Sequence, residues 1–189
     1  MSEPINLVVV SGSPYRPSKT GVLLEALGDV FEQVLPVRRQ LIELADIAAE
    51  IGVAISRDGL SARAEAAVSI IEQADLLLVG APVFRGSVPG LFKHLFDLVK
   101  LDALTGKPVL LAATGGSPRH ALMIEHQLRP LFAFFQSLVL PTGVYASQDD
   151  FIDYRVADLA LKERINLAVL QAAPILRGLF PAAGFARAA

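Results

Sequence analysis

The sequence predicts an α/β fold in which a parallel sheet of five strands, in the order 2-1-3-4-5, is covered by helices on both faces. Two observations carry this prediction. Short apolar runs rich in branched residues alternate with longer segments of helical spacing. The apolar runs lack polar alternation, which is typical of strands buried on both faces. Right-handed crossovers between successive strands then make the neighbours parallel.

The strands and helices follow from these runs in order. We expect strands at residues 7–10, 76–79 and 109–112, a weaker one within 34–44 and a fifth near 138–144. We expect helices that begin at the N-cap Ser18, span 61–73, span 88–101 with Ser87 as the N-cap, span about 120–136, and include Leu161 to Ala172. Residues 45–59 show no clear period and are interpreted as loop. This alternation is flavodoxin-like.

One proline interrupts the helix expected at 120–136. Pro130 has no N–H to bond the carbonyl of His126, and its ring pushes that carbonyl away. A kink or a π-bulge at His126 is therefore expected, and such bulges often mark functional sites.

Composition excludes several classes of function. The chain has 189 residues, so we expect a single domain over 1–180 with a frayed tail at 181–189. Its 17 basic and 19 acidic residues give a net charge of −2, which disfavours nucleic acid as a partner. The absence of cysteine excludes thiolate catalysis and Cys-ligated metals. With no apolar run near the ~18 residues of a membrane span, we expect a cytoplasmic protein without a membrane partner.

Ligands of a doubly wound sheet bind outside the carboxyl ends of its strands. This rule selects three loops rich in Gly, Pro, Ser and Thr, at 11–20, 80–87 and 114–119. Each loop alone is also compatible with an ordinary turn before a helix. Their occurrence after three neighbouring strands indicates a binding site.

The first loop reads Ser-Gly-Ser-Pro-Tyr-Arg-Pro-Ser-Lys-Thr over residues 11–20. Hydroxyls, two cations and a helix N-terminus after a strand suit a phosphate. The Walker spacing fails because five residues follow Gly12 before Ser18, and G-x-G-x-x-G is absent. The loop therefore favours a terminal monophosphate.

The other two loops suit a flat heteroaromatic ring. The stiff segment Pro82-Val83-Phe84 can lie along one edge of such a ring. Adjacent glycines at 115 and 116 present backbone N–H groups that can approach a ligand closely.

These motifs together resemble the NAD(P)H-dependent FMN reductases of the flavodoxin-like fold, over about residues 7–145. Within that family they are most similar to the reductase components of bacterial alkanesulfonate and methanesulfonate monooxygenase systems. The resemblance implies FMN and NADH or NADPH as cofactors, and an FMNH2-dependent monooxygenase as partner. It implies that the FMN phosphate is held by Ser11, Ser13, Arg16, Ser18, Lys19 and Thr20. It implies that the isoalloxazine is flanked by Pro82, Val83, Phe84 and Arg85 and met at its pyrimidine edge by Thr114, Gly115 and Gly116.

The same resemblance places His126 at an inserted π-helix near the flavin, where the residue would tune flavin exchange. It also implies a homotetramer, a dimer of dimers, formed through the apolar segments 88–101 and 131–135. An apolar content of 53% agrees with buried interfaces. Direct hydride transfer needs no acid–base residue, so none is assigned.

Three other functions stay open at this point. The fold could hold FMN permanently and reduce quinones, azo dyes or metal oxyanions, or serve as an electron-transfer module. A nucleotide kinase is a third alternative, against which the Walker spacing speaks. Asp149, Asp150 and Asp153 lack the spacing of a metal loop and are interpreted as a solvated turn.

Overall fold

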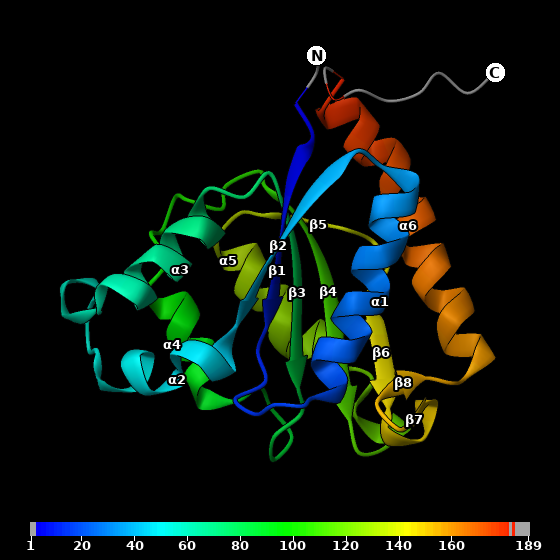
Figure 1. The fold of residues 1–189 in the computed structure, drawn as a ribbon, viewed down its shortest axis with the longest axis horizontal. Helices are drawn as coiled ribbons and strands as arrows, with labels where there is room; N and C mark the ends of the chain where they lie inside the picture. The colour runs from blue at the N-terminus through cyan, green and yellow to red at the C-terminus, as the bar shows by residue number, and fades with distance from the viewer. Residues whose placement is uncertain (1–2, 182, 184–189) are drawn as a thin grey trace.

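The computed structural model describes residues 3–181 and 183. A parallel sheet runs through the middle in the order β2-β1-β3-β4-β5, with β6 also paired to β4 (Figure 1). The predicted strand order is therefore confirmed. The strands are β1 Ile5–Ser11, β2 Val37–Glu43, β3 Leu76–Pro82, β4 Pro108–Gly115, β5 Leu138–Val139 and β6 Val144–Ser147. A separate antiparallel hairpin pairs β7 Phe151–Ile152 with β8 Arg155–Val156.

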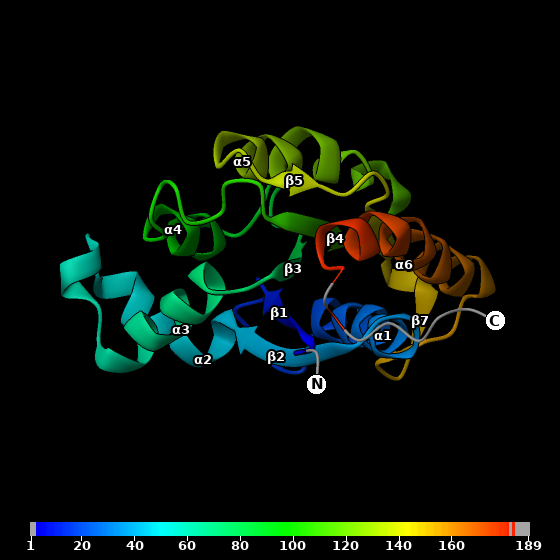
Figure 2. The ribbon, with the colours of Figure 1, turned by 90° about the horizontal axis from the view of Figure 1, so that it is seen from above.

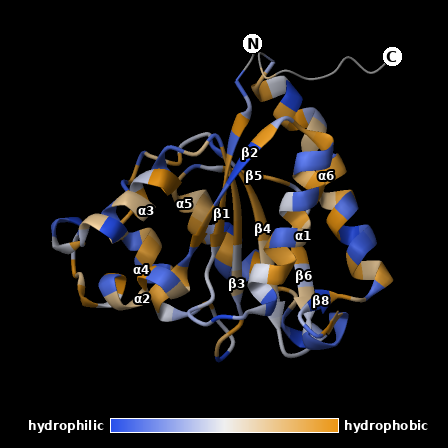
Figure 3. Ribbon diagram, viewed as in Figure 1, coloured by the Kyte–Doolittle hydropathy of each residue, from blue (hydrophilic) through white to orange (hydrophobic). Residues whose placement is uncertain are grey.

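Helices cover both faces of the sheet (Figure 2). α1 Lys19–Val34 and α6 Leu159–Leu179 lie on one face, and α2 Leu44–Val53, α3 Ala62–Glu72, α4 Gly90–Asp97 and α5 Arg129–Phe134 lie on the other. Successive residues of β3 point to opposite faces of the sheet. Leu77 and Val79 pack in the hydrophobic cluster under α2 to α5, and Leu76 and Leu78 pack in the cluster under α1 and α6. The central strands are mainly hydrophobic, and the loops at their carboxyl ends are more polar (Figure 3).

Three expectations about the elements were wrong. Residues 45–59, expected as loop, hold α2 and a 3₁₀ turn at Arg57–Gly59. Leu44, Ile47 and Ile51 are buried at helical spacing and form the inner face of α2. The helix expected at 88–101 is shorter, and its cap is Pro89 instead of Ser87.

The fifth strand is divided in two. β5 and β6 both pair with β4 but are separated by residues 140–143. Pro141 in that gap has no N–H to donate to a ladder, which explains the interruption.

The helix expected at 120–136 is divided into a 3₁₀ turn at Pro118–His120, a π-helix at Ile124–Leu128 and α5. The π-helix contains His126, so the predicted bulge is confirmed. Within the described residues, no helix combines the length and apolar character needed to cross a membrane. The expected frayed tail falls mostly outside the described residues.

Candidate functional site

A pocket of about 380 Å³ opens at the carboxyl ends of the strands, at the end of the molecule opposite the N-terminus (Figure 1). Nine residues predicted from the three loops line it: Ser13, Ser18, Lys19, Thr20, Pro82, Val83, Thr114, Gly115 and Gly116. The topology brings the three loops together because β1, β3 and β4 are parallel neighbours in the sheet.

One end of the pocket is the N-terminus of α1. Ser18 caps the helix: its Oγ accepts a hydrogen bond from Gly21 N–H at 3.0 Å. The first intrahelical bond runs from Val22 N–H to Ser18 O at 3.1 Å, so the N–H groups of Lys19 and Thr20 precede the helical ladder. The first turn carries no acidic side chain. This end of the pocket therefore favours an anion.

Lys19 is the one charged side chain among the described residues that line the pocket. Its ammonium donates to Gln148 O at 3.2 Å and lies 5.8 Å from the centre of the Phe151 ring. The cation therefore bridges α1 and the segment that follows β6. With no carboxylate in the described lining, the local charge is positive.

Two hydroxyls link the first loop to the third. Thr20 Oγ1 and Thr114 Oγ1 are 2.6 Å apart, and the two residues are 1% and 6% exposed. Ser13 Oγ is used within its own loop, donating to Tyr15 O at 3.1 Å and accepting from Tyr15 N–H at 3.3 Å. These bonds fix the backbone that surrounds the anion-binding end.

The other end of the pocket is lined by glycine. A Cβ placed on Gly115 would lie 2.2 Å from the hydroxyl of Tyr145 and 3.3 Å from Val83, whereas one on Gly116 would meet nothing within 4 Å. Tyr145 donates this hydroxyl hydrogen to Ser117 O at 2.6 Å. Burial, together with the nearby charge of Asp150, raises the pKa of Tyr145, so the phenol stays protonated and keeps the glycine loop in place.

The second loop leaves β3 and forms a tight turn. Val83 N–H donates to Thr114 O at 2.7 Å, which joins this loop to the third. Phe84 and Ser87 exchange backbone hydrogen bonds around Arg85 and Gly86, whose φ angles are 52° and 82°. Two positive φ values indicate a type I′ turn, which projects beyond the strands.

Four predicted residues lie elsewhere. Ser11 is 1% exposed within the sheet, where it pairs with Glu43 and Gly80, and its Oγ has no partner in the described part of the chain. Arg16 forms ion pairs with Glu43 and Asp46. Phe84 and Arg85 do not line the pocket.

Phe84 nevertheless contacts a lining residue. Its ring centroid lies 6.1 Å from that of Tyr15, so an aromatic pair stands at the rim of the pocket.

Five lining residues were not assigned from the sequence: Tyr15, Pro17, Ser147, Gln148 and Tyr154. Ser147 is the last residue of β6, which lies beside β4, and Gln148 and Tyr154 follow that strand. The carboxyl-end rule applied to that strand as well would have selected them.

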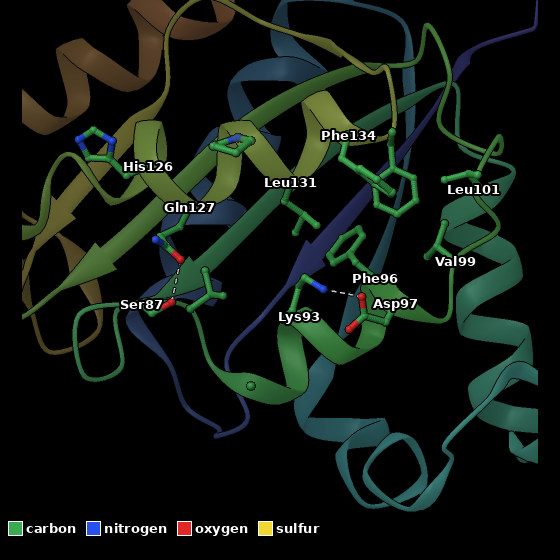
Figure 4. A pocket seen from close by; sticks show the side chains of 14 residues that line it. Ser87, Lys93, Phe96, Asp97, Val99, Leu101, His126, Gln127, Leu131 and Phe134 are labelled. Atoms are coloured by element: carbon green, nitrogen blue, oxygen red, sulfur yellow. Dashed lines mark hydrogen bonds and ion pairs between the residues drawn. The ribbon is translucent and has the colours of Figure 1, made fainter.

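His126 lies at a different cavity. A groove of about 820 Å³ runs between α4 and the π-helix and α5, and His126, Gln127, Phe134 and Ser87 are among its lining residues (Figure 4). Ser87 Oγ donates to Gln127 Oε1 at 2.9 Å, which ties the second loop to the π-helix. His126 lies next to this bonded pair, at one end of the groove.

The pocket fits FMN by the chemistry of its lining. One cation, a helix N-terminus and hydroxyls suit a single phosphate. The open space over Gly116 leaves room for a flat ring against backbone amides. Lys19, Ser18 and Thr20 would hold the phosphate, and Val83 with Gly115 and Gly116 would border the ring.

Comparison with known proteins agrees with this chemistry. Residues 5–151 match the family described as NADPH-dependent FMN reductase. An NADH-dependent FMN reductase SfnF of Pseudomonas fluorescens is 57% identical over 93% of this chain and 94% of its own length. An FMN reductase (NADPH) of Pseudomonas aeruginosa is 55% identical over 94% of this chain and 96% of its own.

A solved oxidoreductase of Corynebacterium diphtheriae has a TM-score of 0.80 at 31% identity, covering 94% of this chain and 99% of that one. The fold, the pocket and these similarities agree, and the chain belongs to the NADPH-dependent FMN reductase family.

Proposed function

We propose that this chain is an NAD(P)H:FMN oxidoreductase that supplies reduced FMN to an FMNH2-dependent monooxygenase acting on sulfonates. The observation that carries the proposal is a single pocket with a cationic helix N-terminus at one end and an amide-lined glycine loop at the other. The named relatives are FMN reductases, which supports the reaction. The sulfonate partner rests on the motif resemblance of residues 11–20, 81–84 and 113–116.

Some of the residues that line the pocket would bind the FMN phosphate, and others would keep the surrounding loops in position. FMN, when bound, supplies the atom that accepts hydride from the nicotinamide. Lys19 and the first N–H groups of α1 hold the phosphate, and Thr20 with Thr114 fixes the loops on both sides. No His, Asp or Glu lines the described pocket, which suits a reaction that depends on stacking and alignment more than on proton transfer.

We further propose a cytoplasmic homotetramer, a dimer of dimers, formed through the groove between α4 and α5. Phe134 and Leu101 at this groove are 68% and 67% exposed, so association would bury apolar surface. His126 at the groove would tune flavin exchange. If His126→Ala leaves flavin occupancy and delivery to the monooxygenase unchanged, this role is refuted.

A second function is a quinone reductase with resident FMN. A quinone reductase of Escherichia coli is 29% identical over 74% of this chain and 76% of its own length. Steady-state kinetics separates the two: free FMN as a substrate supports delivery, whereas ping-pong turnover on quinones with retained FMN supports the alternative.

The phosphate end is tested with flavins that do or do not carry a phosphate. We expect Lys19→Met to weaken FMN binding about 10- to 100-fold, because a charge-assisted hydrogen bond contributes about 1.5–3 kcal/mol. Riboflavin binding should not change. Flavin fluorescence quenching measures both affinities, and Lys162→Met on α6, an exposed lysine outside the pocket, is the matched control.

Two outcomes would count against the proposed function. One is wild-type protein that neither quenches FMN fluorescence nor oxidises NADH or NADPH with FMN. The other is an equal loss of FMN and riboflavin affinity in Lys19→Met, which would place the phosphate elsewhere. Comparison of NADH with NADPH in the same assay assigns the preferred nicotinamide.

A further inference from the structure

The β7–β8 hairpin carries a strained aromatic residue beside the pocket. Phe151 pairs with Val156 and Ile152 with Arg155, so Asp153 and Tyr154 form a two-residue turn. Their φ angles are 47° and 55°. Such a turn favours Asn-Gly, and a bulky side chain in the left-handed region costs about 1–2 kcal/mol. A strained residue at a pocket wall points to a function for its side chain.

The hairpin is held beside the phosphate end of the pocket. Lys19, the lining cation, lies 5.8 Å from the centre of the Phe151 ring of the hairpin and donates to Gln148 O in the turn that precedes it. Asp150 anchors its base, accepting from Ser147 N–H at 2.6 Å, while its own carbonyl accepts from Ala157 N–H at 2.9 Å. Figure 1 shows β7 and β8 next to the N-terminal end of α1. The turn therefore has a fixed position relative to the anion-binding end.

Tyr154 lines the pocket from this turn and is 48% exposed, so its side chain stands at the mouth. The described lining offers one cation, which matches a single phosphate group. Residues 148–155 behind it carry three carboxylates, those of Asp149, Asp150 and Asp153, against the single cation Arg155. A second phosphate that left the pocket along this side would meet an aromatic side chain and a net negative segment.

We propose that Tyr154 is a specificity-determining residue that restricts the flavin to a mononucleotide. Its side chain borders the pocket from the hairpin beside the phosphate end, where the second phosphate and the nucleoside of a dinucleotide flavin such as FAD would have to emerge. The inference rests on the proposed FMN reductase function and adds a basis for choosing FMN over FAD. The strain at Tyr154 is the cost of placing a large side chain at that point of the wall.

The test compares FMN and FAD in binding and in turnover. Wild-type protein should prefer FMN. Tyr154→Gly removes the side chain and also relieves the positive φ, so the variant is expected to fold at least as well. We expect it to reduce the FMN-to-FAD ratio of affinities, measured by fluorescence quenching, about tenfold. The ratio of kcat/KM for NADH oxidation should fall in parallel, mainly through a lower KM for FAD.

Two controls isolate the side chain. Tyr154→Phe keeps the ring and should keep the wild-type ratio. Ile152→Ala lies on the same hairpin but does not line the pocket, and it should also leave the ratio unchanged. Wild-type protein that binds FAD as tightly as FMN would overturn the inference, as would an unchanged ratio in Tyr154→Gly. Both results leave FMN reduction intact and are distinct from a failure to bind or reduce FMN.

Discussion

The buried hydroxyl pair between α1 and β4 gives a double-mutant prediction. Thr20 Oγ1 and Thr114 Oγ1 are 2.6 Å apart in an environment that exposes 1% and 6% of the two residues. Valine has nearly the shape of threonine, so Thr20→Val removes one hydroxyl and leaves the other buried without this partner. Such a group costs about 1–3 kcal/mol. Thr114→Val should cost a similar amount.

The double variant should behave differently from the sum of the two. With both hydroxyls replaced by methyl groups, no polar atom of this pair is left buried alone, and the change can be nearly neutral. The coupling energy in the free energy of unfolding should then equal the sum of the two single costs, roughly 2–6 kcal/mol. For a chain of this size each kcal/mol corresponds to about 2–4 °C in Tm.

Urea unfolding of the flavin-free protein measures the cycle. Thr142→Val, which removes a hydroxyl from an exposed hydrogen bond with Gln171, is the control and should stay within about 0.5 kcal/mol of wild type. The double variant should regain stability but not FMN affinity, because both hydroxyls at the phosphate end are gone. Strictly additive single effects would refute the reasoning.

Two further predictions concern the ion pairs of Arg57 with α3 and the glycine loop of the pocket. Arg57 donates to Glu65 and Glu72, whose side chains are 42% and 10% exposed, and these bonds raise its pKa. Arg57→Met should therefore lower the free energy of unfolding by about 2–3 kcal/mol at pH 7. The hydrogen bond from Arg57 lowers the pKa of Glu65. At Glu72 burial is the largest single influence and alone would raise the pKa, but the Arg57 bond, the Lys100 N–H bond and the charges of Arg57 and Lys100 together lower it. The free energy of unfolding of the wild type should then fall as the pH drops below the unfolded carboxyl pKa of about 4.3 and through the lower pKa values of the folded state. Arg57→Met, which lacks these bonds, should lose less stability over the same pH range. Urea unfolding at several pH values measures this difference, and an identical pH dependence of stability in the wild type and Arg57→Met would contradict the prediction. Gly115→Ala should displace the Tyr145 hydroxyl, lower the free energy of unfolding by about 1–3 kcal/mol and weaken flavin binding. Thermal unfolding with and without FMN measures both effects. An unchanged Tm would show that the loop relaxes freely and would contradict the prediction.

Much of the architecture could be predicted because the strands are buried on both faces. Leu76 to Val79 form an unbroken apolar run, and such runs give the strand order once crossovers are right-handed. The loops after β1, β3 and β4 could be selected by the carboxyl-end rule. Pro130 predicted the π-helix because a missing N–H has a definite structural consequence.

The remaining features depend on long-range contacts. Arg16 looks like a phosphate ligand in the sequence, but Glu43 and Asp46 come from another strand and helix to pair with it. Tyr154 reaches the pocket through a hairpin whose turn has no Asn-Gly signal. The short period of α2 is visible only once its buried face is known.

The segment at the end of β3 borders both the pocket at the strand ends and the groove between α4 and α5. Pro82 and Val83 border the pocket at the strand ends, while Ser87 and Val88 border the groove between α4 and α5. The turn at Arg85 and Gly86 is closed by two backbone hydrogen bonds, so this strip is a stiff connector. If binding at the groove displaces the connector, it changes the affinity of the pocket for its ligand. By thermodynamic reciprocity, the ligand then changes the affinity of the groove for its partner by the same factor. Release of the cofactor from the pocket and contact between subunits at the groove would in that case both depend on the position of this connector.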